Sequence, residues 1–396
     1  MHQTARNPPS TASVTPVTYR DMSELRKITG PTRSAGWPTL PIGIRDMNPA
    51  MRCGSARVGA AAATLPMAAS AQAKSFDLQS VFGLQVPSIG PSPVKWAERV
   101  ALMTNNEVKI KVHGAGEFVP PFEVFGAVSN GSIPMGFDWI GYWAGKIPVA
   151  NLVGSMPFGP DPELFLGWMF KGGGLEIIQK AYDPHNVKII PCHLVVPEAG
   201  GWFNKEIKTV DDLKGLKMRI AGLGAKAMEK LGATVQLVPA GEIFVSLERG
   251  RIEAAEFSAP QLDFGLGLQK IAKYYYFPGW HQPASWDSII VNMKVWKSLP
   301  AKHQQVMMEA CHANITYNNY DQIDAQVDAI EKIEKAGVKI ERFPEPVLAA
   351  LRKASAEVMA EEAAKDPLFK EALQSLNAYV ARVGRWSDLQ ALPRGN

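Results

Sequence analysis

Apolar and polar positions along the chain switch repeatedly between strand-like and helix-like spacing. Strand-like alternation at 76–82 and 107–113 flanks a helix-like stretch at 92–106. A further helix is expected to end at Asn130-Gly131, followed by another strand. Short strand and helix units in alternation predict parallel α/β sheets with helices on both faces.

A second set of alternating units begins after residue 200, and two sets in series predict two lobes. Its predicted elements are a strand at 217–221, a helix at 224–232, a strand at 234–238, a helix at 239–250 and a strand at 252–257. The expected fold class is therefore α/β, with two lobes of similar construction.

Two extended segments are expected to form a hinge between the lobes. The stretch 187–196 is almost continuously apolar, which is typical of a strand buried on both faces, and 285–296 would carry the chain back. The segment 298–337 predicts one helix, with Ser298 as its cap and Pro300 in its first turn. Such a helix would reach about 60 Å, enough to lie across both lobes. A further helical region is expected at 345–383.

The stretch 51–73 has the order of a cleavable secretory signal. Arginines precede a short apolar, small-residue segment that ends in Ala71-Gln72-Ala73. The alternative is an alanine-rich core helix, which Pro66 fits poorly. Residues 1–50 show no periodicity, and we hypothesise that the true start is Met47 or Met51. A signal peptide predicts export to the periplasm.

Net charge changes when this leader is set aside. The whole chain carries +4, but residues 1–73 hold eight Lys and Arg against three Asp and Glu, so the remainder is near −1. No polybasic stripe remains, and we expect no nucleic-acid partner. No run of eighteen apolar residues argues for a membrane span. Cys192 and Cys311 are expected to be buried thiols, with a disulfide as the alternative.

The stretch at 219–227 supports two different functions. Gly222, Gly224 and Ala227 fit the G-x-G-x-x-A pattern of a dinucleotide loop, with Glu242 near the position of a ribose-binding acid, so an NAD-linked oxidoreductase is one alternative. The other is that Arg219, at the carboxyl end of a strand, points into the ligand crevice and holds a carboxylate through two parallel hydrogen bonds. We favour the second.

Candidate pocket residues surround that arginine. Aromatic residues at loop-like positions predict an apolar wall, from which we select Tyr142, Trp143, Trp202 and Phe257; Trp202 fits the pocket or the core equally well. Two acids at strand ends, Glu198 and Glu256, are suited to a hard cation such as Na⁺ or Ca²⁺. His281 is expected to be a polar residue at the rim. The sequence has no nucleophile elbow, P-loop or C-x-x-C motif, which favours a binding protein over an enzyme.

Taken together, these segments resemble the solute-binding proteins of tripartite ATP-independent periplasmic (TRAP) transporters, in particular the branch that binds 2-oxo acids and related monocarboxylates. The resemblance covers 74–390 and rests on several stretches: GEFVPPFEVFGAVSNGSIPMG, YWAGKIP, FKGGGLE, GGWFNKEIKTVDDLKGLKMRIAGLG, GRIEAAEF, KYYYFPGW and GRWSDL. It implies a two-lobed periplasmic fold with a long helix spanning both lobes, and closure of the lobes on a ligand whose carboxylate is held by Arg219.

The resemblance also implies a cation that bridges ligand and protein. Glu256, the main chain of Phe257 and Glu198 would coordinate it, and we add Gln282 to this set. The branch commonly has glutamine where this chain has Glu198, and tryptophan where it has Phe257. The second carboxylate favours Ca²⁺ over Na⁺. The missing tryptophan N–H leaves the identity of the bound acid open, so Glu198 and Phe257 count among the substrate-binding residues as well.

The predicted function is capture of a small organic acid and its delivery to the membrane subunits of a TRAP permease. A ligand-sensing partner of a membrane receptor is a third alternative, beside the oxidoreductase. The resemblance also implies pairing of two copies through a C-terminal helix at 367–383, although packing within one chain explains its apolar face equally well. The predicted regions are a leader at 1–73, lobes at 74–196 and 197–284, a return strand and spanning helix at 285–337, and C-terminal helices at 338–396.

Overall fold

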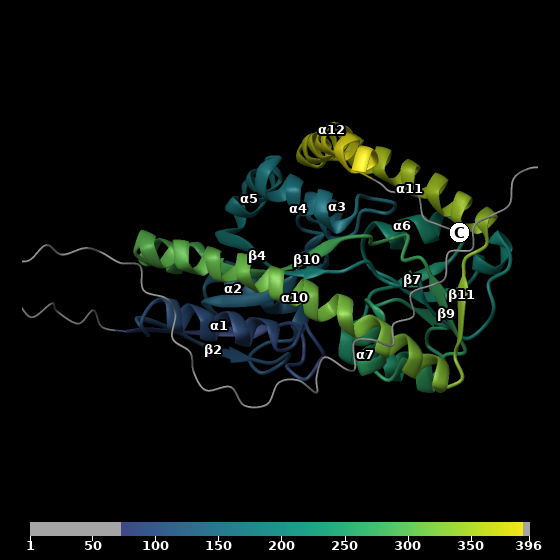
Figure 1. Cartoon of the computed structure of the whole chain (residues 1–396), viewed down its shortest axis with the longest axis horizontal. Coiled ribbons are helices and arrows are strands. Elements are labelled where there is room, and N and C mark those ends of the chain that lie inside the picture. Colours follow the sequence, from purple (N-terminus) through teal and green to yellow (C-terminus); the bar gives the residue numbers. More distant parts are fainter. Residues whose placement is uncertain (1–72, 391–396) are drawn as a thin grey trace, which may run out of the picture. The chain divides into compact units, whose positions relative to one another are not determined.

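The computed structural model describes residues 73–390 (Figure 1). The predicted leader, apart from Ala73, and the two candidate start residues lie outside this range and stay predictions. Within 73–390, no helix combines the length and the apolar character needed to cross a membrane.

The first sheet has five strands in the order β2-β1-β3-β10-β4. β1, β2 and β3 are parallel, whereas β10 runs antiparallel to both β3 and β4. The prediction of a parallel sheet is therefore wrong for β10, because the chain reaches this strand on its return from the second sheet and not through a crossover helix. The strands are β1 (Lys74–Ser80), β2 (Val108–His113), β3 (Met135–Trp139), β4 (Val187–Val195) and β10 (Ser285–Asn292).

The second sheet has six strands in the order β11-β9-β5-β8-β6-β7. It is also mixed, since β5 is antiparallel to both β8 and β9. The three strands predicted after residue 200 are present, but each is shorter than the pattern suggested. The strands are β5 (Gly201–Phe203), β6 (Lys217–Arg219), β7 (Thr234–Gln236), β8 (Ala254–Ala255), β9 (Tyr274–Phe277) and β11 (Lys339–Arg342).

Helices connect and cover the strands. The predicted helix ending at Asn130-Gly131 is confirmed, because Gly131 takes a left-handed conformation that glycine adopts easily. The α-helices that precede β10 are α1 (Ser92–Met103), α2 (Val124–Asn130), α3 (Pro148–Gly154), α4 (Pro162–Lys171), α5 (Gly174–Tyr182), α6 (Gly222–Lys230), α7 (Ala240–Glu248) and α8 (Pro260–Gly265).

The long helix α10 (Ala301–Lys335) begins later than predicted. The side chain of Asn292 accepts a hydrogen bond from the Lys294 amide at 3.0 Å and caps a short helix, α9 (Met293–Ser298). Ser298 therefore ends α9 instead of capping α10, and the predicted extended segment 285–296 is correct only as far as Asn292. The 35 residues of α10 give a length of about 52 Å. In Figure 1 the helix, in green, passes both sheets, and it packs on β4 and α1 and then on α8, so a spanning helix is confirmed.

A disulfide joins Cys192 in β4 to Cys311 in α10. The expectation of two thiols is therefore wrong, although both residues are fully buried as predicted. β4 turns Cys192 toward the helix, and the two Cα atoms lie 4.3 Å apart. Sequence spacing could not show this, because the two residues are 119 positions apart.

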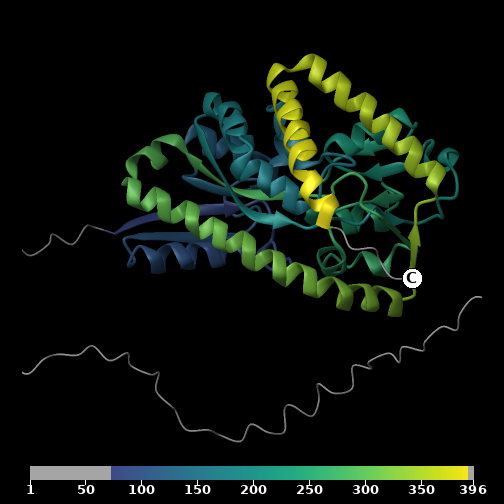
Figure 2. The same cartoon turned by 45° about the horizontal axis from the view of Figure 1, so that its top comes forward.

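The C-terminal region forms two helices instead of one. α11 (Glu345–Lys365) ends at Lys365, because Asp366 precedes a proline, and α12 (Pro367–Gln390) continues through the GRWSDLQ stretch. Figure 2 shows α12 folding back from α11 toward the helices beside the first sheet. It packs on α3, α4 and α5, and its apolar face is buried there through Phe369, Ala372 and Leu376. In the structure, the apolar face of α12 thus packs against its own chain, and the pairing of two copies through this helix stays a prediction.

Three connections carry the chain between the sheets. The first, 196–200, joins β4 to β5, the second, 278–284, joins β9 to β10, and α10 leads to β11. The first two are short and lie close together, since the Glu198 amide donates to the Gln282 carbonyl at 3.3 Å. Both supply residues of the site.

Candidate solute and cation site

A small cavity lies where the two sheets face each other. About 30 Å³ of it is open to the centre of a water molecule, and ~10–15 Å³ suffices for one water, so the space suits a solute of a few heavy atoms. Six of the predicted site residues line it: Tyr142, Glu198, Arg219, Glu256, Phe257 and Gln282. The other lining residues are Phe82, Ile89, Trp139, Val195, Ala221, Ser258, Leu262 and Asp287.

Arg219 ends β6 and is almost fully buried at 2% exposure. Its Nη1 donates to the Glu256 carbonyl at 2.6 Å and to Glu256 Oε1 at 2.8 Å, and its Nε donates to the Val238 carbonyl at 3.4 Å. Within residues 73–390, Nη2 makes no such bond. The predicted two-nitrogen clamp on a ligand is therefore not available in this arrangement, and Nη2 is the nitrogen left to bind one.

Glu256 follows the short strand β8, beside Arg219. Its Oε1 accepts from Arg219 Nη1 and, at 2.7 Å, from the Ala221 amide. Burial alone would raise the pKa of this carboxyl, but the charge of Arg219, followed by the hydrogen bond from His281, holds it below its ordinary value. Glu256 therefore remains an anion in the closed interior.

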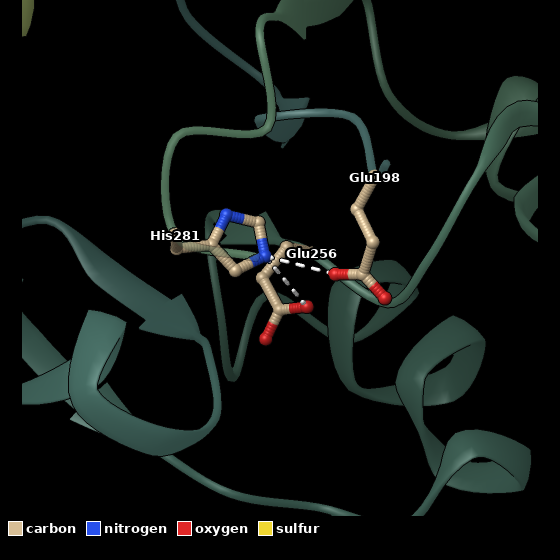
Figure 3. Close-up of side chains that lie close together, drawn as sticks. All are labelled: Glu198, Glu256 and His281. Atoms are coloured by element: carbon tan, nitrogen blue, oxygen red, sulfur yellow. Dashed lines mark hydrogen bonds and ion pairs between the residues drawn. The ribbon is translucent and has the colours of Figure 1, made fainter. Parts of the chain in front are cut away.

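His281 lies between two carboxylates, and the prediction of a rim position is wrong. Figure 3 shows its ring directed at both acids, with Nε2 at 3.0 Å from Glu198 Oε2 and 3.5 Å from Glu256 Oε2. Burial opposes the charged imidazolium, but the hydrogen bonds and charges of Glu198 and Glu256 raise the pKa of His281 above its ordinary value. The connection 278–284 folds inward here, which no local sequence signal indicates.

Glu198 is held by the same connection. Its Oε1 accepts from Gln282 Nε2 at 2.7 Å, and burial raises the pKa of its carboxyl. Glu198, Glu256 and His281 each offer one ligand atom, and these three atoms lie within 4.8 Å of one another. Two carboxylates at that separation fit a hard cation, with the imidazole as a further donor. Gln282 lines the cavity but its amide nitrogen is used on Glu198.

Two predicted wall residues lie outside the cavity. Trp143 neighbours Tyr142 on a short 3₁₀ helix (Ile140–Trp143), so their side chains diverge; Trp143 stacks on Phe125 and its Nε1 donates to Asp138. Trp202 on β5 is fully buried against Tyr275, and its Nε1 donates to Asp263 Oδ2 at 2.8 Å. Both tryptophans belong to the core.

The glycines after Arg219 serve close packing. A Cβ on Gly222 would lie 2.5 Å from Ser155 Cβ, and one on Gly224 would lie 2.7 Å from His281 Cβ. Gly222 also has a φ of +66°, which favours glycine. These contacts bring the start of α6 against the end of α3 and the His281 connection, where a dinucleotide phosphate would have to approach. The oxidoreductase alternative is not supported.

Comparison with known proteins places the chain. Residues 88–366 match the bacterial extracellular solute-binding protein family 7, which is the DctP family. The chain belongs to this family. The predicted TRAP solute-binding function and the two-lobed α/β fold are thereby confirmed. A monocarboxylate 2-oxoacid-binding periplasmic protein of Nostoc sp. strain PCC 7120 is 39% identical over 302 residues, which are 76% of this chain and 82% of that protein.

Two solved structures share the solute-binding fold closely. A TRAP periplasmic solute binding protein from Colwellia psychrerythraea, with bound calcium and pyruvate, has a TM-score of 0.77 and 34% identity over 81% of this chain and 98% of its own. A second, from Pseudoalteromonas atlantica T6c, holds sodium and pyruvate, with a TM-score of 0.77 and 33% identity over 81% of this chain and 97% of its own. Calcium and sodium are the two ions that the sequence predicted.

One polar pair of this solute-binding protein escaped the sequence analysis. Asp287 on β10 lines the cavity, and its Oδ2 accepts from His193 Nδ1 in β4 at 2.7 Å. Both side chains are buried. The signal was present, because Asp287 is the one acid in β10 and His193 lies within the largely apolar strand β4. An acid in such a strand needs a partner or a ligand.

Proposed function

We propose that this chain captures a small monocarboxylate together with a cation in the periplasm and delivers it to the membrane subunits of a TRAP permease. The observation that carries the proposal is Arg219, whose Nη2 has no hydrogen-bond partner among residues 73–390 and which lines a cavity of apolar, acidic and a few neutral polar side chains. A ligand carboxylate supplies what that nitrogen lacks.

The same residues support a cation beside the ligand. Glu198 and Glu256 would hold it, with the main chain of Phe257, whose ring lies 5.7 Å from the Arg219 guanidinium, completing the set. The ion would supply positive charge against which the ligand's oxygens are bound. Glu198, Glu256 and a ligand carboxylate would bring three negative charges to the ion, against the one positive charge of Arg219. A divalent ion offsets more of this excess than a monovalent one, which favours Ca²⁺ over Na⁺.

Capture by closure of the lobes is supported by the fact that both sheets supply residues to the cavity wall. Arg219 ends β6 and Glu256 follows β8, both in the second sheet, whereas Asp287 lies in β10 of the first sheet and Tyr142 follows its β3. A ligand that contacts both sides stabilises the closed arrangement through those joint contacts alone. The connections 196–200 and 278–284 are the natural hinge, and they support lobe boundaries near 196 and 284.

The disulfide between β4 and α10 supports a periplasmic location. Structural disulfides persist in oxidising compartments and are rare in the bacterial cytosol. The secretory signal predicted at 51–73 agrees with this. The family consists of binding receptors, so we propose that the chain performs no chemistry on its solute.

Replacement of Arg219 tests the site. Arg219→Ala should weaken the binding of pyruvate, measured by calorimetry with Ca²⁺ present, by about 2–5 kcal/mol, because a buried ligand carboxylate loses its partner. Arg219→Lys keeps the charge that Glu256 needs and should give an intermediate loss. Arg251→Ala, at an exposed position after α7, is the matched control and should leave affinity unchanged. Equal affinity of Arg219→Ala and the control, in folded proteins, contradicts the site assignment.

A further inference from the structure

Asp287 sits on the cavity face of the first sheet. In the register of β10, it lies directly opposite Trp139 of β3 and His193 of β4. Residues opposite one another on neighbouring strands point to the same face, so the three side chains form a row. Trp139 and Asp287 both line the cavity. The row therefore faces Arg219, which enters the cavity from the second sheet.

One carboxylate oxygen of Asp287 has no hydrogen-bond partner in the described part of the chain. Oδ2 accepts from His193 Nδ1 at 2.7 Å, and His193 is held in turn by Ser88 Oγ, 3.2 Å from its Nε2. Oδ1 is buried and has no hydrogen-bond partner within residues 73–390. Burial raises the pKa of Asp287 despite the opposing hydrogen bond and charge of His193. A buried carboxylate that accepts a single hydrogen bond is short of donors, and an unpaired buried oxygen is unfavourable.

The residues around the cavity limit which ligand group can donate a hydrogen bond to Asp287 Oδ1. The lining of the cavity includes the apolar residues Phe82, Ile89 and Val195, beside the hydroxyl of Tyr142. A ligand carbonyl directed at Oδ1 would bring two acceptors together, which is repulsive. An ammonium group carries three N–H donors and needs three acceptors, whereas a hydroxyl has one donor to place. A single free acceptor matches a hydroxyl.

We propose that Asp287 determines ligand specificity, and that the solute is a small hydroxy monocarboxylate whose carboxylate binds Arg219 and whose hydroxyl donates to Asp287 Oδ1. This inference rests on the proposed function, and it narrows the substrate class from carboxylates in general to those with a hydroxyl donor. His193 is a positioning residue, because it fixes the orientation of the Asp287 carboxylate without lining the cavity.

Two matched ligand series test the inference on the unmodified protein. Calorimetry with Ca²⁺ present compares lactate, pyruvate and propionate, and then 3-hydroxybutyrate, acetoacetate and butyrate. In at least one series the hydroxy acid should bind about 10- to 100-fold more tightly than both the oxo acid and the plain acid, as expected for one hydrogen bond to a charged group. Equal or tighter binding of the oxo or plain acid in both series overturns the inference and leaves the proposed function intact. No binding by any of the six acids removes both.

The variant Asp287→Asn gives a second, independent test. Its amide oxygen can still accept from His193, which turns the NH₂ group toward the cavity, so the acceptor becomes a donor. The preference should then invert in favour of the oxo acid. Asp138→Asn is the matched control, since Asp138 is equally buried in the adjacent strand β3 but does not line the cavity, and it should keep the order of the unmodified protein. An unchanged order in a folded Asp287→Asn protein contradicts the role of Asp287.

Discussion

Glu256 and Arg219 show that one pair of side chains serves both the fold and the site. Their two hydrogen bonds join the ends of β6 and β8. Together with the bond from Arg219 Nε to the Val238 carbonyl, they leave Nη2 for a solute. The sequence placed Arg219 correctly at the carboxyl end of a strand, where open α/β sheets bind ligands. It could not show which nitrogens are free, because the partner is 37 positions away.

The residues that were missed share a physical reason. Strand and helix periods say which side chains share a face, but not which face meets the cavity. That depends on how the sheets pack. Trp143 was therefore predicted as a pocket residue and Trp202 as pocket or core, and both are core. Asp287 was not predicted and His281 was placed at the rim, yet both lie at the site.

Asp138 leads to a prediction about pH. Burial raises the pKa of its carboxyl to about 8, against the hydrogen bond from Trp143, and the charge of Asp287 raises it further. In the unfolded chain this carboxyl titrates at about 4. Between these values the folded protein binds the extra proton, so the free energy of unfolding falls as pH rises, by up to about 1.4 kcal/mol per pH unit, and levels off above about 8.

Asp138→Asn removes this titrating carboxyl and should therefore remove its contribution to the fall in the free energy of unfolding with pH. Urea unfolding at about pH 5 and about pH 9 measures it, and the unmodified protein should lose more stability than the variant over this interval. Parallel loss in the two proteins would show that Asp138 does not titrate as its burial implies.

At the scale of elements, the pattern of apolar positions predicted most helices and strands but not strand direction. β1, α1, β2, α2 and β3 follow strict periods and lie close to the predicted ranges. β10 and β5 are antiparallel because the chain passes between the sheets, and that path is not written in local periodicity. The break before Pro367 did have a signal, since the residue before a proline disfavours helix.

The bond between β4 and α10 predicts a measurable contribution to stability. Cys192→Ala with Cys311→Ala should lower the free energy of unfolding by about 2–4 kcal/mol, because the cross-link restricts a loop of more than a hundred residues in the unfolded chain. Urea unfolding of the variant, and of the unmodified protein with and without reductant, measures the loss. If the double variant matches the oxidised protein, the cross-link does not stabilise the fold.

At the scale of the whole described chain, solute and cation share one cavity between two sheets. Anything bound there touches both halves, so it stabilises the folded state by mass action. The lobe boundaries at 196 and 284 and the pairing of two copies stay predictions, because the strands and helices alone do not test them.

Removal of the cation tests this shared arrangement. Protein stripped with a chelator should bind pyruvate weakly, and Ca²⁺ should raise the melting temperature more in the presence of pyruvate than in its absence. Na⁺ should do so less, since Glu198 adds a second carboxylate that a monovalent ion leaves unbalanced. A response to Na⁺ alone would contradict the divalent preference. Melting curves that neither ion changes relative to the stripped protein would contradict the cation site.

The cross-linked helix α10 has a mechanical consequence. Cys311 clamps it to one sheet, and Lys335 lies about 36 Å further along the rod. Because the displacement produced by a rotation grows with distance from the hinge, a small rotation of the second sheet should move the tip of α10 near Lys335 more than the clamped part. A pair of fluorophores, one at that tip and one on α8, would therefore convert solute capture into an optical signal.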